Sequence, residues 1–216
     1  MMSWIRVFGR RPAQRLAVVD SYRFADGVRR RFAIKHGALD DAAVALVEDA
    51  ARQWFRLAVR QPKVQLFMPS IVVDDLWHEM ILDTPGYADF CVAVFGRFLH
   101  HVPESMMPSA GDAAYRTVRL GQTFRLAQED ERGRPGALPL LFRVDRELKI
   151  KGARRYVADC AGGRCRATHG AICLWHVAGV GKVERRRPAR WRGGPTPGEI
   201  NAVHDGGSFD GGCSSL

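Results

Sequence analysis

The side chains best suited to bind a metal lie on two neighbouring predicted helices. Asp74 and His78 are four residues apart, so they lie on the same side of one helix. His101 lies at the end of the next predicted helix, and the short connection at 83–85 favours an antiparallel pair in which Asp74 and His101 meet. One carboxylate and two imidazoles suit zinc or another divalent first-row metal. The sequence therefore predicts a candidate metal site.

Two other interpretations of these residues stay open. In the first, Asp74 forms a hydrogen bond with a histidine at the edge of the core, and the second histidine caps a helix. In the second, Cys91 is a nucleophile that His78 or His101 activates and Asp74 orients. Cys91 lies within an apolar stripe, however, and a buried cysteine is usually unreactive. A cysteine-dependent hydrolase is thus the third-ranked hypothesis, and a protein without catalytic activity is expected.

A second set of metal-binding residue types lies near the C-terminus. It consists of Cys160, Cys165, His169 and Cys173. These are the ligand types of a small zinc knuckle, although four residues rather than the usual two separate the first two cysteines. We predict no export signal, so the five cysteines are expected to stay reduced, which favours metal binding or free thiols over disulfides. Thiols without any metal are the alternative.

Positive charge is concentrated in the same part of the chain. Residues 149–192 contain twelve Lys and Arg residues and two Asp and Glu residues. The net charge of this segment is therefore +10, the same as that of the whole chain. The candidate nucleic-acid-binding residues are Arg185, Arg186, Arg187, Arg190, Trp191 and Arg192. Arginine can contact phosphate, and a tryptophan ring can stack on a base. This segment predicts binding to nucleic acid or another acidic polymer, and a solvated basic arm is the other interpretation.

Apolar periodicity and helix-end signals predict the elements that position these residues. We expect helices over residues 12–36, 42–59, 71–82, 84–102, 109–129 and 140–148. Four Gly-Gly pairs interrupt the chain after residue 150, and the periodicity is lost there. The expected fold is mainly α, with a helical bundle-like domain over residues 1–150 and an irregular, basic, Cys/Gly-containing extension over residues 151–216.

The hydropathy pattern bears on the cellular setting. No apolar run approaches the eighteen or so residues that a transmembrane helix needs. The basic N-terminus lacks the apolar stretch of a signal peptide. We therefore expect a cytoplasmic protein without a membrane span.

Several rare residues occur in a distinctive order in the middle of the chain. They are Asp74, Trp77, His78, Tyr87, Cys91 and His101, followed by Val102 and Pro103. Over about residues 40–105 this order resembles the glycine-rich domain-containing protein family, in which an Asp-x-x-Trp-His helix precedes a tyrosine, a cysteine and a histidine. The resemblance implies a helical domain without an assigned activity, followed by a glycine-rich tail. Residues 205–213 are a short version of that tail.

Three functional hypotheses follow in order. The first is a non-catalytic metal-binding or interaction module centred on Asp74, His78 and His101, with an undefined protein partner. The second is a nucleic-acid-binding protein that acts through residues 160–192. The third is the cysteine-dependent hydrolase.

Overall fold

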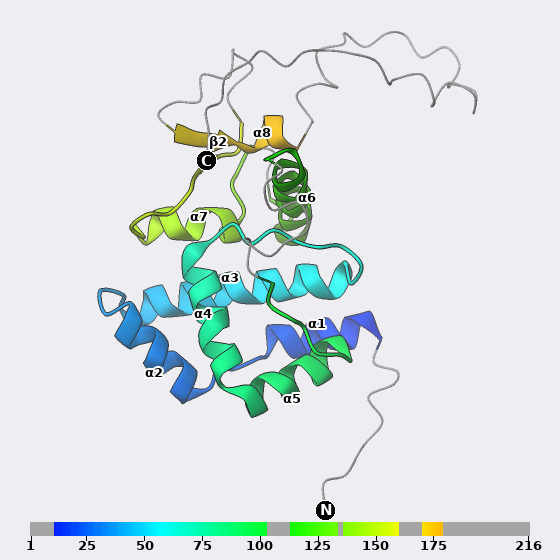
Figure 1. The fold of residues 1–216 in the computed structure, drawn as a ribbon, viewed down its shortest axis with the longest axis vertical. Coiled ribbons are helices and arrows are strands. Elements are labelled where there is room, and N and C mark those ends of the chain that lie inside the picture. Colours follow the sequence, from blue (N-terminus) through cyan, green and yellow to red (C-terminus); the bar gives the residue numbers. More distant parts are fainter. Residues whose placement is uncertain (1–10, 103–112, 134–135, 160–169, 179–216) are drawn as a thin grey trace, which may run out of the picture.

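The computed structural model describes residues 11–102, 113–133, 136–159 and 170–178, and these are mainly helical (Figure 1). The elements are α1 (Pro12–Asp20), α2 (Asp26–Lys35), α3 (Asp41–Arg60), α4 (Ile71–Leu82), α5 (Thr84–Phe95), α6 (Ala113–Glu131), α7 (Leu140–Glu147), β1 (Arg155–Val157), β2 (Ala171–Cys173) and α8 (Leu174–Val177). The expected mainly α fold is confirmed. Among the described residues, no helix is long and apolar enough to cross a membrane.

The prediction of one helix over residues 12–36 is wrong, because the chain breaks between α1 and α2. The connection is held by contacts far away in the sequence. Arg52 on α3 donates hydrogen bonds to the carbonyl oxygen of Tyr22 at 2.9 and 3.1 Å. The ring of Tyr22 packs on Phe90 of α5, and Phe24 is buried in the core. The residues on both sides of this break favour a helix, and the tertiary contacts of the connection outweigh that local preference.

Helix α3 crosses the middle of the molecule and contacts α1, α4, α6 and α7 (Figure 1). It begins where the Asp40 carboxylate accepts a hydrogen bond from the Ala43 amide at 2.8 Å. The amide of Gln53 is buried, and its oxygen accepts a hydrogen bond from the backbone N–H of Leu141 at 2.8 Å. Gln53 thereby connects α3 to the start of α7. Its oxygen is the hydrogen-bond partner of one of the backbone N–H groups at the N-terminus of α7.

Helices α4 and α5 form the expected hairpin, and each has a defined end. The buried carboxylate of Asp145 on α7 accepts hydrogen bonds from the Ser70 hydroxyl and the Ile71 amide at 2.6 and 2.8 Å, where a negative charge meets the N-terminus of α4. Helix α5 ends at Phe95 because Gly96 takes a left-handed conformation, with φ of 70°. The prediction that this helix continues to residue 102 is therefore wrong.

Part of the C-terminal region packs against the helices. Strands β1 and β2 pair in parallel, and α8 lies on α6. The hydroxyl of buried Tyr156 donates a hydrogen bond to the carbonyl oxygen of Pro69, and Leu174 belongs to the core. The division of the chain at residue 150 stays a prediction, although these contacts show that residues on both sides of this position pack together.

Candidate metal centre

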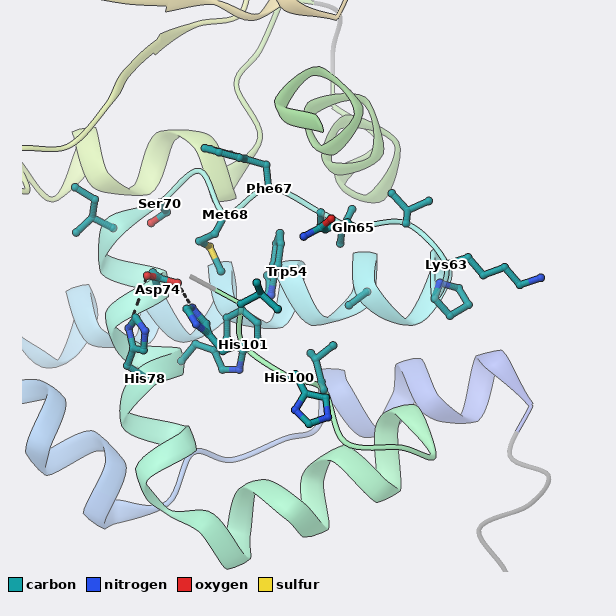
Figure 2. A pocket seen from close by; sticks show the side chains of 18 of the residues that line it. Trp54, Lys63, Gln65, Phe67, Met68, Ser70, Asp74, His78, His100 and His101 are labelled. Carbon is teal, nitrogen blue, oxygen red and sulfur yellow. Dashed lines mark hydrogen bonds and ion pairs between the residues drawn. The ribbon is translucent and has the colours of Figure 1, made fainter. Parts of the chain in front are cut away.

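Asp74, His78 and His101 converge on one point of the structure (Figure 2). The Nε2 atom of His101 lies 2.9 Å from Oδ1 of Asp74, and Nδ1 of His78 lies 3.7 Å from Oδ2 of the same carboxylate. Each residue offers one ligand atom, and these three atoms all lie within 4.8 Å of one another. Asp74 and His78 come from consecutive turns of α4, as the sequence predicts, but His101 comes from the segment after α5 and not from a helix.

The backbone of Leu99 fixes the segment that carries His101. Its N–H donates to Sγ of Cys91 at 3.5 Å, and its carbonyl oxygen accepts a hydrogen bond from the Tyr87 hydroxyl at 2.5 Å. That hydroxyl in turn accepts a hydrogen bond from Nε1 of Trp77 at 3.0 Å. Three of the rare motif residues therefore connect α4 and α5 to the backbone of Leu99, two residues before His101.

Aromatic rings enclose His101. The Trp77 ring meets it edge-on with a centroid distance of 4.6 Å, and the His78 ring lies 4.4 Å away. The His101 side chain is 14% exposed, whereas that of Asp74 is 32% exposed and that of His78 is 45% exposed. His101 is thus held in place by packing, and His78 is the ligand with most freedom to adjust.

The spacing of these atoms is compatible with a metal ion. Zinc ligands at about 2.0–2.2 Å from the ion lie roughly 3–3.5 Å from one another. The His101 nitrogen lies 2.9 Å from one oxygen of Asp74, and the His78 nitrogen lies 3.7 Å from the other oxygen. A set with one ligand atom from each residue spans at most 4.8 Å, so the side chains would have to move closer together around an ion. The same 2.9 Å contact between Asp74 and His101 is also a good hydrogen bond, so the hydrogen-bond interpretation fits this geometry as well.

The other acidic residues of α4 face away from this site. Asp75 pairs with Lys35 and His36, and Glu79 pairs with Arg31, all on α2 or at its end. His36 therefore belongs to a separate ion-pair group. Asp75 and Glu79 are therefore not part of the group around Asp74.

Cys91 has a structural environment. Its side chain is fully buried, and its described hydrogen-bond partners are the Leu99 N–H and the Tyr87 hydroxyl. Burial raises the pKa of the Cys91 thiol, and the hydrogen bond from Leu99 opposes this effect only in part. Among the described contacts, none joins Cys91 to His78 or His101. The geometry therefore gives the cysteine-nucleophile hypothesis no support.

Most of the second candidate metal site lies outside the described residues, which exclude Cys160, Cys165 and His169. The nucleic-acid-binding candidates from Arg185 to Arg192 also lie outside them. Cys173 is described, and its Sγ lies 3.2 Å from Nδ1 of His176. Sequence reasoning missed His176, although its spacing of three residues from Cys173 at the start of a helix was the available signal.

A cleft of about 620 Å³ opens beside the three candidate ligands. Trp54 and Ala58 of α3 line it, together with residues of the segments 62–70 and 97–102. Figure 2 shows Asp74, His78 and His101 grouped at one end and Lys63 at the other. His100 also lines this cleft, with its ring against Phe98, so both adjacent histidines contribute to one surface.

Comparison with known proteins places the chain in a family. No curated protein and no solved structure matches it. The model of the UCP032817-like family, however, matches residues 14–177, a span that runs from α1 to the end of α8 and includes all three candidate ligands. The chain belongs to the UCP032817-like family.

Proposed function

We propose that this protein binds one divalent first-row metal ion, with zinc as the leading candidate, through Asp74, His78 and His101. The observation that carries the proposal is the convergence of three ligand atoms within 4.8 Å of one another from two separate segments. These are the residue types that bind zinc and similar ions. The network from Trp77 through Tyr87 to Leu99 supports it, because an arrangement of ligands needs fixed supporting residues.

We further propose that the site is a binding or interaction module without catalytic activity. Asp74 is the single carboxylate among the described residues that line the cleft. If the metal takes Asp74 as a ligand, no other carboxylate among the described lining residues could act as a general base, and His100 is the one remaining imidazole among them. The buried Cys91 thiol, whose pKa is raised by burial, offers no activated nucleophile.

Metal content in histidine variants tests the proposal. The full-length protein, with Cys160→Ser and Cys165→Ser to weaken the second candidate site, should bind about one zinc ion per chain. His78→Ala and His101→Ala should each remove most of that metal, as measured by elemental analysis after dialysis. His36→Ala is the matched control, because His36 pairs with Asp75 and does not belong to the group around Asp74.

Two results would count against a metal at this position. One is a zinc content near zero in the parent protein, which would favour the Asp74–His101 hydrogen bond alone. The other is an unchanged zinc content in His101→Ala, which would place the metal elsewhere. Circular dichroism of each variant distinguishes loss of a ligand from loss of the fold.

Nucleic-acid binding through Arg185–Arg187 and Trp191 is the second candidate function. The concentration of the chain's net positive charge in residues 149–192 favours it. Relationship to the glycine-rich domain-containing proteins is likewise a proposal, and it rests on the order of Asp74, Trp77 and His78 followed by Tyr87, Cys91 and His101.

A further inference from the structure

We propose that the cleft beside Asp74, His78 and His101 binds a small organic acid, with its carboxylate on the metal ion and its apolar body along α3. This inference rests on the proposed function, because the metal supplies the anchor for the carboxylate. It extends that function by assigning a class of ligand to the site.

The size and position of the cleft suit a small molecule. Its volume of about 620 Å³ falls within the roughly 300–1,000 Å³ of typical ligand sites. A metal held by three protein ligands keeps at least one coordination position for another molecule. The cleft lies directly beside the three ligands (Figure 2), so a molecule inside it can reach that position.

The walls of the cleft suit an apolar body. Trp54, Ala58, Leu66, Met68 and Leu99 are among the residues that line it. An apolar group placed against them removes apolar surface from water, which favours binding.

The charges around the cleft favour an anion. Lys63, Arg97 and Arg154 line it, and Asp74 is the single acidic residue among its described lining residues. The Arg154 guanidinium lies over the Phe67 ring at 5.0 Å, and Arg97 donates to the carbonyl oxygen of Pro62, so both groups are held near the cleft. A divalent ion bound to Asp74 adds a further net positive charge. The combined field attracts anionic ligands.

An organic acid uses both features of the cleft at once. A neutral apolar molecule would leave the metal position and the basic groups unused, and a simple inorganic anion would leave the apolar walls unused. The probe should therefore combine a carboxylate with an apolar group, and 4-phenylbutyrate has this chemistry. Its alcohol, 4-phenylbutan-1-ol, is the matched control, because it keeps the body and lacks the charge.

Calorimetric titration of the zinc-loaded full-length protein tests the inference. We expect 4-phenylbutyrate to bind the zinc-loaded protein at least tenfold more tightly than its alcohol does. We also expect it to bind the zinc-loaded protein at least tenfold more tightly than the zinc-free protein. Ala58→Leu fills the cleft from α3 without touching a metal ligand, so it should weaken binding of the acid at least tenfold at unchanged zinc content. Ala45→Leu places the same change on an exposed position of the same helix and should have no effect. Ala58→Val is the smaller substitution to use if Ala58→Leu lowers the circular dichroism signal.

The outcomes separate this inference from the proposed function. Equal affinity for the acid and the alcohol, or binding that Ala58→Leu and Ala58→Val leave unchanged, would overturn the ligand assignment. So would one zinc ion per chain with no detectable binding of the acid, a result that would leave the metal site standing. If zinc-free and zinc-loaded protein bind the acid equally, the carboxylate is not anchored on the metal ion. Failure to take up zinc at all would overturn the proposed function itself.

Discussion

At the scale of single residues, the rare side chains of the motif divide into two groups. Asp74, His78 and His101 carry the candidate ligand atoms, whereas Trp77, Tyr87 and Cys91 hold the segment that presents His101. The sequence indicated the first group, because ligand types and helical spacing are visible in it. It did not indicate the second, because the link runs through the backbone of Leu99, and backbone hydrogen bonds leave no pattern in residue types.

Cys91 should make the protein less stable at alkaline pH. Burial raises the pKa of the folded thiol above its ordinary value of 9.0, so the unfolded thiol ionises first. Between the two pKa values the unfolded state binds fewer protons, and the free energy of unfolding therefore falls as the pH rises through about 9. Urea unfolding at pH 7 and pH 10 should show this fall, and the fall should be smaller in Cys91→Ala. Identical pH dependence in both proteins would contradict the burial argument.

At the scale of elements, most helices could be predicted from apolar periodicity and helix-end residues. Helix α7 was expected over residues 140–148 and spans Leu140–Glu147, and the hairpin of α4 and α5 was expected from its short connection. Two boundaries failed for identifiable reasons. The break after α1 depends on contacts with Arg52 and Phe90, which are distant in sequence. Helix α5 ends because Gly96 takes a left-handed conformation, although the apolar pattern continues after it.

The contact of α6 with α8 depends on a glycine. A Cβ atom at Gly121 would lie 2.6 Å from the carbonyl oxygen of Val177 and 2.8 Å from Cα of Ala178. Overpacking of this kind costs about 1–3 kcal/mol, which exceeds the roughly 0.5–1 kcal/mol that alanine gains over glycine in a helix. Gly121→Ala should therefore lower the free energy of unfolding, measured with urea.

Gly27 in α2 is the matched control for Gly121. The nearest atom to a Cβ at Gly27 is Nη1 of Arg31 at 3.6 Å, an ordinary contact. Gly27→Ala should therefore leave stability unchanged or raise it by up to about 1 kcal/mol. A Gly121→Ala protein as stable as the parent would show that α8 does not rest closely on α6.

At the scale of the whole molecule, the sequence predicted the fold class but not how far the packed region extends. Loss of apolar periodicity after residue 150 indicated an irregular extension, yet Tyr156 and Leu174 lie in the same core as the helices. A strand of three residues is too short to produce a recognisable pattern.

The position of the domain boundary can be measured by shortening the chain. A chain that ends after Ala178 should keep the thermal stability of the full-length protein, because it retains β1, β2 and α8. A chain that ends at residue 150 should still unfold cooperatively but at a lower temperature, since Tyr156 and Leu174 no longer cover α6 and α7. Absence of a cooperative transition in the shorter chain would show that residues 151–178 are required for folding.

Nucleic-acid binding should depend on salt and on residues after Ala178. Each phosphate contact contributes about 0.7 to the slope of log affinity against log salt for single strands. Replacing Arg185, Arg186 and Arg187 together by Gln should therefore flatten the slope by about 2 in a titration with single-stranded RNA. A chain ending after Ala178 is the control, and equal binding by it would remove the basic segment as the binding site.

The central claim, that Asp74, His78 and His101 hold a metal ion, is tested most directly by X-ray absorption spectroscopy at the zinc edge. The full-length protein loaded with one zinc ion per chain should show a shell of nitrogen and oxygen atoms at about 2.0–2.1 Å, with the outer-shell scattering of two imidazole rings. In His101→Ala at the same total zinc, that imidazole contribution should disappear. A first shell dominated by sulfur at about 2.3 Å, which would place the metal on cysteines, would contradict the account.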